Sequence, residues 1–288
     1  MYTFNPSGLL TDITKDIIDY SKYEDLDPTF VSRYLLQAAI INHYGDLKNI
    51  KKLKVLDVGG AGSMLGEFID IDLTIIDIIE NENAPDNYIV GSALEMPFKD
   101  KEFDVVISCD VLEHIKKEDR RKFLEECSRV SKDLIVIAAP FNLTGVRLAE
   151  ISANDFYRKI TGQNHIWLEE HLQDELPELY QTKKILKDLV EDYGHFSHTA
   201  LDYWQLITRL SFFFIYKNEH PDFVEHIKKI NEFYLEKIMN QDFSATGYRS
   251  FIIASKTSKV NIVKSNDAYN PDLERMFTLI TDSIPGLI

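Results

Sequence analysis

A glycine-rich turn and a downstream aspartate have the spacing of a nucleotide-binding site. The turn at residues 57–62 has the sequence DVGGAG and follows an apolar run, and Asp77 ends the next such run 20 residues after the turn begins. A backbone that approaches a ligand closely needs residues without a β-carbon. A carboxylate at the end of the neighbouring strand can accept hydrogen bonds from both ribose hydroxyls. The two features together predict a ligand that contains a nucleoside.

Short apolar runs alternate with helical stretches on both sides of this turn. The runs are continuously apolar, as expected of parallel strands buried on both faces, and cover residues 54–58, 73–76, 88–90, 105–108 and 134–138. Between the last two, an apolar stripe at helical spacing comprises Phe123, Leu124, Cys127 and Val130. The alternation predicts an α/β fold with a doubly wound, mostly parallel, Rossmann-like sheet.

Changes in this pattern divide the chain into five expected segments. They are an N-terminal helical extension (1–50), the ligand-binding α/β core (51–140), an acceptor-side insertion or lid with a helix (141–200), helices and a late strand that complete the core (201–258), and a C-terminal tail with one short helix (259–288). The helix before residue 194 is expected to end at Gly194, because glycine favours helix C-termini. Residues 248–255 are expected to form the late strand.

Four features in the first half match a known family in order and spacing. They are residues 55–60 (VLDVGG), Asp77, residues 91–98 (GSALEMPF) and residues 103–115 (FDVVISCDVLEHI). Together they resemble the class I S-adenosylmethionine (SAM)-dependent methyltransferases, in the branch that contains the quinone-biosynthesis methylases. The resemblance implies a methyltransferase with SAM as cofactor and S-adenosylhomocysteine as product.

The resemblance also implies roles for residues of the turn. Asp57 and Gly59 would line the methionine portion of SAM. The backbone from Gly59 through Gly60 to Gly62 would face the amino-acid end of that portion. Asp77 would hold the ribose.

The later segments would complete the cofactor site in the same way. Ser92, Ala93 and Leu94 would flank the adenine, while Asp110 and Val111 would lie near the sulfonium.

A dinucleotide is the alternative ligand for the same turn. A Rossmann dehydrogenase typically has a third glycine, in the spacing GxGxxG, where a helix N-terminus faces pyrophosphate. Counted from Gly60 and Gly62, that glycine would stand at position 65, which is Leu65. SAM carries no phosphate, so the sequence favours SAM over NAD.

The acceptor side is expected in residues 164–172 (NHIWLEEHL), after the fifth strand. This segment is similar to one in methyltransferases that are encoded with glycosyltransferases for cell-surface polysaccharides. Trp167 would stack on a sugar face, and His165 or His171 would accept a hydroxyl proton. His114 is a third candidate base, since the resemblance places it beside the cofactor pocket.

Other interpretations exist for these aromatic residues. Trp167 and His171 share a helix face, so they could simply pack together. His165 and His171 would lie on roughly opposite sides of a helix, which is poor geometry for a metal, and no metal site is predicted. An aromatic cluster further on is interpreted as core or as a homodimer face, and it comprises Phe212, Phe213, Phe214 and Tyr216.

Composition limits the classes of partner. The 288 residues carry 47 acidic and 32 basic side chains and a net charge of −15, which argues against nucleic acid because phosphate binding rests on Lys and Arg. Cys109 and Cys127 lie in apolar segments and indicate a reducing compartment. The sequence has no recognisable signal segment, and its longest apolar run, residues 210–216, is too short to span a bilayer. The protein is therefore expected in the cytoplasm.

The leading functional hypothesis is SAM-dependent O-methylation of a small hydroxylated acceptor, such as a sugar or glycan. Methyl transfer from a sulfonium is an in-line displacement that depends mainly on alignment, so the fold predicts the donor better than the acceptor. One alternative is methylation of a quinone-like carbon, an amine or a protein side chain. Another is a catalytically inactive SAM-binding subunit of a larger assembly.

Overall fold

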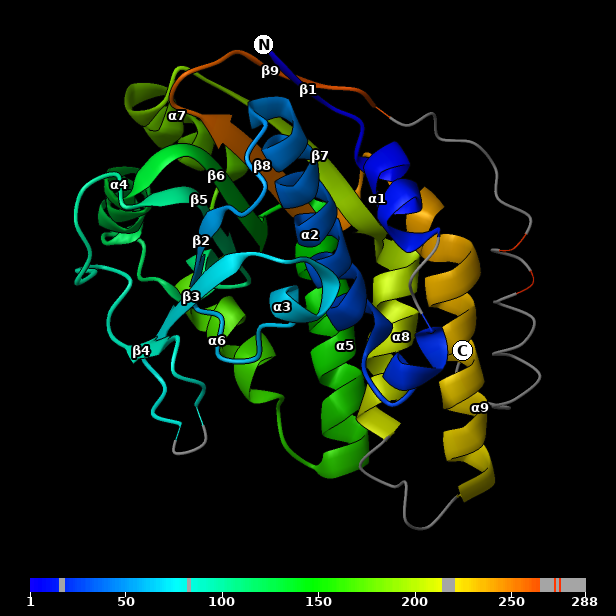
Figure 1. Cartoon of the computed structure of the whole chain (residues 1–288). Coiled ribbons are helices and arrows are strands. Elements are labelled where there is room, and N and C mark those ends of the chain that lie inside the picture. The colour runs from blue at the N-terminus through cyan, green and yellow to red at the C-terminus, as the bar shows by residue number, and fades with distance from the viewer. Residues whose placement is uncertain (16–18, 82–83, 214–220, 265–271, 273–274, 276–288) are drawn as a thin grey trace.

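The chain forms one large sheet with helices on both faces (Figure 1). The structure is a computed structural model that describes residues 1–15, 19–81, 84–213, 221–264, 272 and 275. Its strands are β1 (Tyr2–Phe4), β2 (Lys54–Val58), β3 (Asp72–Asp77), β4 (Tyr88–Val90), β5 (Phe103–Cys109), β6 (Ser131–Pro140), β7 (Asp192–Ala200), β8 (Gly247–Ser255) and β9 (Val260–Ile262). Its longer helices are α1 (Pro6–Thr14), α2 (Pro28–Lys48), α4 (Arg120–Val130), α5 (Thr144–Thr161), α6 (Ile166–Asp174), α7 (Leu179–Leu189), α8 (Leu201–Phe213) and α9 (Pro221–Phe233).

Short helical turns link these elements. They are η1 (Tyr20–Tyr23), α3 (Leu65–Phe68), η2 (Leu112–His114), η4 (Tyr234–Ile238) and η5 (Met239–Gln241). Among the described helices, none is both long enough and apolar enough to cross a bilayer.

The order of strands in the large sheet is β4-β3-β2-β5-β6-β8-β7. Pairing is parallel from β4 to β6, whereas β8 runs antiparallel to both of its neighbours. The chain leaves β2 towards β3 on one side and later returns to β5 on the other side, so the strand order reverses between β2 and β5. In open α/β sheets, ligands bind beyond the carboxyl ends of the strands at such a reversal. The predicted doubly wound, mostly parallel sheet is confirmed.

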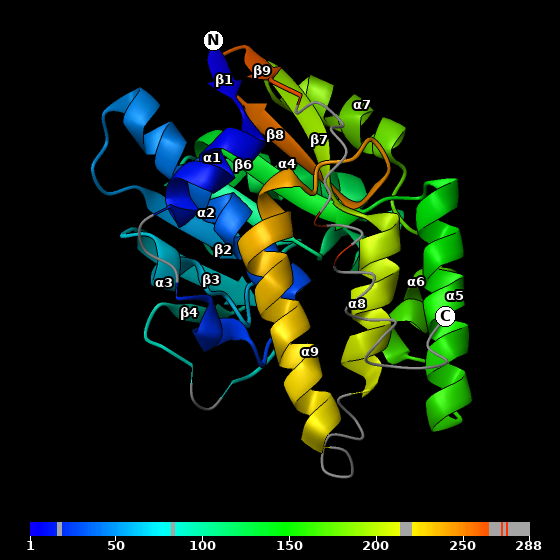
Figure 2. The same cartoon turned by 90° about the vertical axis from the view of Figure 1, so that its right-hand side faces the viewer.

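Side chains that alternate along the central strands fill a separate core on each face of the sheet. In β6, Leu134 and Val136 point into the core beneath α2, α8 and α9, whereas Ile135 and Ile137 point into the core beneath α4 and α7. Figures 1 and 2 show these two groups of helices on opposite sides of the sheet. Strands buried on both faces explain why the runs in the sequence are continuously apolar.

Most of the predicted strands have nearly the predicted bounds. The runs at 54–58 and 88–90 match β2 and β4, and β3, β5 and β6 extend beyond the predicted runs at both ends. The late strand expected at 248–255 is β8, which begins one residue earlier.

The prediction that Gly194 ends a helix is wrong. The helix α7 ends at Leu189, and Gly194 lies inside β7, at the edge of the sheet. A β-carbon at Gly194 would stand 2.4 Å from Cγ1 of Ile262, so the glycine lets β9 cross closely over β7.

A small parallel pair, β1 with β9, joins the N-terminus to the end of the described core. β9 lies in the segment expected to be a tail, and the short helix expected there falls outside the described residues. Phe214 and Tyr216 of the predicted aromatic cluster also fall outside them.

Candidate functional site

A cavity of about 950 Å³ opens beyond the carboxyl ends of β2, β3 and β5, at the point where the strand order reverses. Of the predicted cofactor residues, those that line it are Gly59, Gly62, Asp77, Ser92, Ala93, Leu94, Asp110 and Val111. The three candidate bases, His114, His165 and His171, line it as well. The cavity therefore brings together predicted donor-side and acceptor-side residues from segments up to 112 positions apart.

The backbone of the turn makes the floor of the cavity. Gly59 has a φ of +78°, and a β-carbon there would stand 2.1 Å from Cγ2 of Val111. A β-carbon on Gly60 would meet the carboxylate of Asp57, 2.5 Å from its Cγ. Both glycines are needed for close packing, as a turn that must approach other groups requires.

Asp57 lies beneath the turn rather than in the cavity. Its side chain is buried and is absent from the cavity wall, and no hydrogen-bond partner within the described residues reaches its Oδ2. Burial raises the pKa of Asp57 to about 6, against the lowering effects of the Ser63 hydroxyl and of Arg33. Gly60, directly above this carboxylate, is likewise absent from the cavity wall.

Asp77 ends β3 and faces the cavity with its carboxylate. Its Oδ2 accepts a hydrogen bond from the N–H of Ala61 at 3.1 Å, and its Oδ1 accepts one from the N–H of Ile79 at 3.0 Å. These bonds tie the end of β3 to the glycine turn and leave further lone pairs on both oxygens for a ligand.

An apolar slot lies next to Asp77. Ile78 and Ile79 line the cavity although their exposed fractions are 74% and 56%. Ala93 and Leu94 also line it, and the hydroxyl of Ser92 accepts a hydrogen bond from the N–H of Leu94 at 3.1 Å. Exposed isoleucines are costly in water, so an apolar ring such as adenine suits this slot. The sequence reasoning missed both isoleucines, although their position directly after Asp77 was a usable signal.

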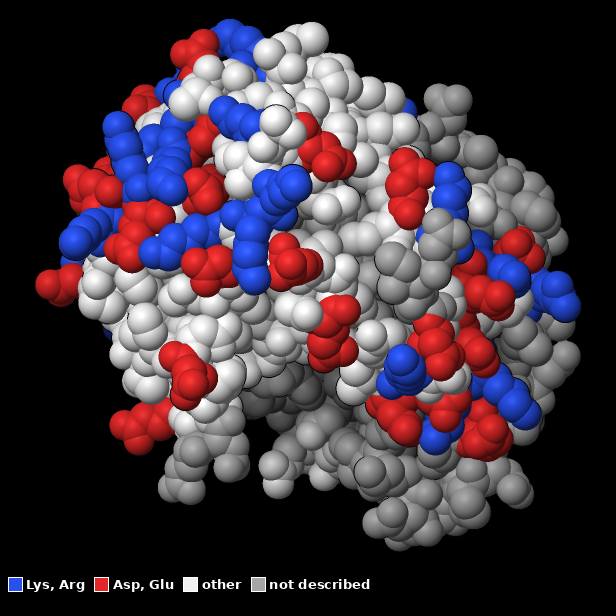
Figure 3. Space-filling view, in the orientation of Figure 1, with Lys and Arg blue, Asp and Glu red and all other residues white. Residues whose placement is uncertain are grey.

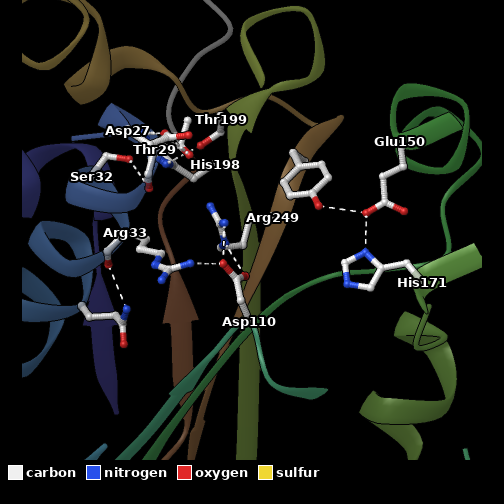
Figure 4. Close-up of polar contacts among 12 residues, drawn as sticks. Asp27, Thr29, Ser32, Arg33, Asp110, Glu150, His171, His198, Thr199 and Arg249 are labelled. Atoms are coloured by element: carbon white, nitrogen blue, oxygen red, sulfur yellow. Dashed lines mark hydrogen bonds and ion pairs between the residues drawn. The ribbon is translucent and has the colours of Figure 1, made fainter. Parts of the chain in front are cut away.

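Asp110, just after β5, is held between two arginines (Figure 4). Arg33 from α2 and Arg249 from β8 both donate hydrogen bonds to its carboxylate. Burial alone would raise the pKa of Asp110, but the two guanidinium groups outweigh this effect and hold it below its ordinary value. Asp110 has a φ of +57°, so these bonds also fix an uncommon backbone conformation.

Arg33 was missed by the sequence reasoning, which treated α2 as an extension of the fold. Both Arg33 and Tyr34 line the cavity. The guanidinium of Arg33 also lies 4.4 Å from the centre of the Phe30 ring. A lone arginine among apolar residues of a buried helix was the available signal, but nothing in the sequence connected it to Asp110.

A buried histidine stands on the opposite side of the cavity. His171 on α6 is 7% exposed, and its Nδ1 lies 2.9 Å from Oε1 of Glu150 on α5. The hydroxyl of Tyr248 donates to the same oxygen at 2.8 Å. Figure 4 shows the contact between His171 and Glu150, with Nε2 of His171 turned away from Glu150. No described residue makes a hydrogen bond to that Nε2.

The other two candidate bases lie close to His171. The rings of His114 and His171 have centres 5.0 Å apart, and Nδ1 of His114 is 3.3 Å from Oε2 of Glu170. His165 precedes α6 and lies against Phe212, with ring centres 5.2 Å apart. Burial lowers the pKa of both His114 and His165, so burial favours their neutral forms.

Trp167 and His171 do not pack on one another in the way that one interpretation of their spacing suggested. Trp167 is 62% exposed at the cavity wall, with its ring centre 5.5 Å from that of His165. His171 is turned to the interior and to Glu150. Phe212 lines the cavity, which places one member of the predicted aromatic cluster at the site.

The lysines next to β2 are paired with acidic side chains. Lys52 contacts Asp70 at 3.0 Å and Lys54 contacts Glu102 at 2.8 Å. Figure 3 shows basic side chains interspersed with acidic ones over the face of the molecule that it displays. This face therefore offers no continuous basic track of the kind that a nucleic-acid backbone requires.

The fold and the site define the class. A Rossmann-like sheet carries, at its switch point, a glycine turn, a carboxylate at the end of the second strand of the sheet and an apolar slot. Residues 62–134 match the family model described as "Methyltransferase domain". This part of the chain is therefore a methyltransferase domain, and the cofactor expected for it is S-adenosylmethionine.

Two solved structures illustrate the resemblance. A magnesium protoporphyrin IX methyltransferase from Synechocystis PCC 6803 with bound S-adenosylhomocysteine is 12% identical, over 87% of this chain and 94% of that chain, with a TM-score of 0.46. A Haemonchus contortus phosphoethanolamine N-methyltransferase with bound phosphomonomethylethanolamine and S-adenosylhomocysteine is 18% identical, over 72% of this chain and 49% of that chain, with a TM-score of 0.43. No curated protein matches the sequence. The family match ends before α5 and α6, so it does not cover Glu150, His165 or His171.

Proposed function

We propose that the protein transfers the methyl group of SAM to a hydroxyl group of a small polyol, such as a sugar or the end of a glycan. The observation that carries this proposal is the contact of His171 with Glu150, together with the unpaired Nε2 on the other side of the imidazole ring. The oxygen of Glu150 in this contact already accepts a hydrogen bond from the hydroxyl of Tyr248, so we assign the ring proton of His171 to Nδ1, which leaves a lone pair on Nε2.

That lone pair can accept the proton of an acceptor hydroxyl. In the proposed reaction, the acceptor oxygen forms a bond to the methyl carbon while the bond from that carbon to sulfur breaks. The hydroxyl proton passes to Nε2 of His171, and S-adenosylhomocysteine leaves as a neutral sulfide. Glu150 stabilises the imidazolium that forms, and the hydroxyl of Tyr248 fixes Glu150 in place. Glu150 and Tyr248 are therefore positioning residues.

The donor side supports the same arrangement. The cavity that contains the glycine turn and Asp77 also contains His171, so donor and acceptor would share one space. Trp167 is exposed at the cavity wall and suits a sugar face, which stacks on aromatic rings through its C–H groups. Alignment of the two substrates in one cavity supplies much of the acceleration for this type of displacement.

Release of S-adenosylhomocysteine, measured with a panel of sugars and glycan termini, tests the proposal directly. His171→Gln should lower kcat by about 10²- to 10⁴-fold, the usual contribution of a general base, and should leave the Kd for SAM unchanged. Glu150→Gln should lower kcat less, because the amide oxygen still accepts from Nδ1 without the stabilising charge. His43→Gln is the matched control, since His43 lies outside the cavity on α2. Full turnover by His171→Gln would refute the role of His171, and methylation of amines alone would refute the hydroxyl acceptor.

A further inference from the structure

A second feature of the acceptor wall is a group of metal-ligating side chains. Glu113 and His114 follow β5 in η2, and His171 reaches the same place from α6. One potential ligand atom from each of these residues lies within 4.8 Å of the other two. Two ligand atoms that are each about 2.1 Å from one ion lie about 3–4 Å apart. Small movements of these side chains would therefore bring their ligand atoms to the separations of a metal site.

Both histidines of this group are already oriented as metal ligands usually are. Nδ1 of His171 faces Glu150 at 2.9 Å, and Nδ1 of His114 faces Glu170 at 3.3 Å. Histidines that bind metals generally donate their second ring N–H to a carboxylate, which fixes the tautomer and makes the other nitrogen a better ligand. The arrangement leaves Nε2 of each ring as the lone-pair atom.

Two buried atoms of the group also lack a hydrogen-bond partner. They are Oε2 of Glu113 and Nε2 of His171, and neither has a partner among the described residues. Glu113 is 2% exposed and His171 is 7% exposed. A buried polar atom without a hydrogen-bond partner is costly. A cation bound by this group would supply a partner for such atoms.

The ligand types select the class of metal. Two imidazoles and one carboxylate suit zinc and similar transition metals, whereas magnesium and calcium prefer sites made of oxygen alone. Three protein ligands leave a fourth position, and all three residues line the cavity, so that position faces the acceptor. We propose that Glu113, His114 and His171 bind one divalent transition-metal ion of the zinc class, and that this ion excludes proton acceptance by His171.

The exclusion of proton acceptance rests on the proposed function, because Nε2 of His171 cannot bind a metal and a proton at once. The metal-bound protein would therefore be inhibited. The binding of a metal ion by the three residues is argued from geometry alone and can be tested without turnover.

The test uses the full chain after treatment with a chelator. Calorimetric titration with Zn²⁺ should give one site per chain, and Co²⁺ should give the visible absorption of a four-coordinate ion. Mg²⁺ should not compete. His114→Ala should weaken Zn²⁺ binding by more than about 100-fold, and Glu150→Gln by about 10- to 100-fold, the usual effect of losing a residue that orients a ligand. His165→Gln is the matched control, because His165 lines the same cavity but is not in the group.

His114 has a partly exposed side chain, so His114→Ala should fold, and its circular dichroism spectrum and unfolding midpoint verify this. Glu113→Gln provides a second variant that removes a ligand. Absence of Zn²⁺ binding, or binding that survives both variants, would overturn the site.

Turnover separates the two proposals. Inhibition by stoichiometric Zn²⁺ that His114→Ala relieves supports both of them. Activation by Zn²⁺ bound at this site would support the metal site and refute the role of His171 as a base. Zn²⁺ binding in a protein that methylates no hydroxyl would refute the proposed function alone.

Discussion

Arg249 donates two parallel hydrogen bonds to Asp110, from Nε to Oδ1 at 2.7 Å and from Nη2 to Oδ2 at 2.6 Å. The pair joins the late antiparallel strand β8 to the end of β5, where the cofactor cavity begins. Arg33 supplies a second cation to the same carboxylate. The cavity therefore depends on a contact between strands that lie 139 positions apart in the sequence.

Loss of this contact should destabilise the fold. Arg249→Met leaves the buried carboxylate of Asp110 with Arg33 as its remaining cation. Removal of one member of a buried ion pair costs about 3–5 kcal/mol, and Arg33 should keep the loss near about 3 kcal/mol. The free energy of unfolding in urea measures it. Arg121→Met removes an arginine that is half-exposed on α4, and its effect should stay within about 0.5 kcal/mol. Equal stability of the two variants would contradict a structural role for Arg249.

Asp77 should determine the affinity for the ribose of SAM. Asp77→Ala removes the acceptor for two ribose hydroxyls and also frees the N–H of Ala61. Hydrogen bonds to a charged group are worth about 1.5–3 kcal/mol, so the Kd for SAM should rise by about 10- to 100-fold. Calorimetry with S-adenosylhomocysteine avoids interference from turnover. Asp72→Ala, at the exposed other end of β3, is the control and should bind as the native chain does. An unchanged Kd for Asp77→Ala would refute the ribose assignment.

His198 should make the fold sensitive to acid. It is fully buried on β7, with Nε2 at 3.1 Å from the carbonyl oxygen of Met239. Burial, together with the charge of Arg249, lowers the pKa of His198 from 6.5 to about 4, although the contact with the Met239 carbonyl acts in the opposite direction. The unfolded chain therefore binds more protons than the folded chain between these values. Stability from this group is present above about pH 6.5 and is lost as the pH falls towards about 4.

The loss expected from His198 is about 3 kcal/mol, because each unit of pKa is worth about 1.4 kcal/mol. Urea unfolding at several pH values between about 4 and 7 measures it. Asp242 opposes the trend, since burial raises its pKa to about 6 and makes the fold bind a proton more readily than the unfolded chain. Asp242→Asn removes this opposing effect, so the same urea series on that variant isolates the pH dependence of the remaining groups. Adding His198→Gln to Asp242→Asn should then make the free energy of unfolding depend less on pH. An unchanged slope in that comparison would contradict this assignment.

The sequence located the strand ends of the donor side directly, and the reason is physical. The donor side is built by consecutive strands and turns whose apolar runs and glycines are local signals, so the bounds of β2 and the position of Asp77 followed directly. Arg33 and Arg249 reach Asp110 from distant elements, and no local pattern connects them. Such contacts depend on the tertiary fold.

One error and one omission share a cause. Gly194 was assigned to a helix end because glycine is common there. It lies instead in β7, where the missing side chain leaves room for β9. The pairing of His171 with Glu150 was missed because Glu150 lies on α5, in a segment that was expected only as part of an irregular insertion or lid. In both cases the role of the residue depends on contacts with residues that are distant in the sequence.

The glycine turn offers the sharpest test of the site's packing. Gly59→Ala places a β-carbon 2.1 Å from Cγ2 of Val111 at a φ of +78°, so either the turn or Val111 must move. The left-handed conformation alone costs a residue other than glycine about 1–2 kcal/mol. We expect the free energy of unfolding to fall by about 2 kcal/mol and the affinity for SAM to fall by at least about tenfold, because the moving atoms line the cavity. Gly66→Ala is the matched control in α3, where no atom outside the helix lies within 4 Å of the new β-carbon. Alanine at that position should be neutral or stabilise the protein by up to about 1 kcal/mol, since it restricts the unfolded chain. If Gly59→Ala bound SAM as tightly as Gly66→Ala, the close approach of the turn to the ligand would be refuted.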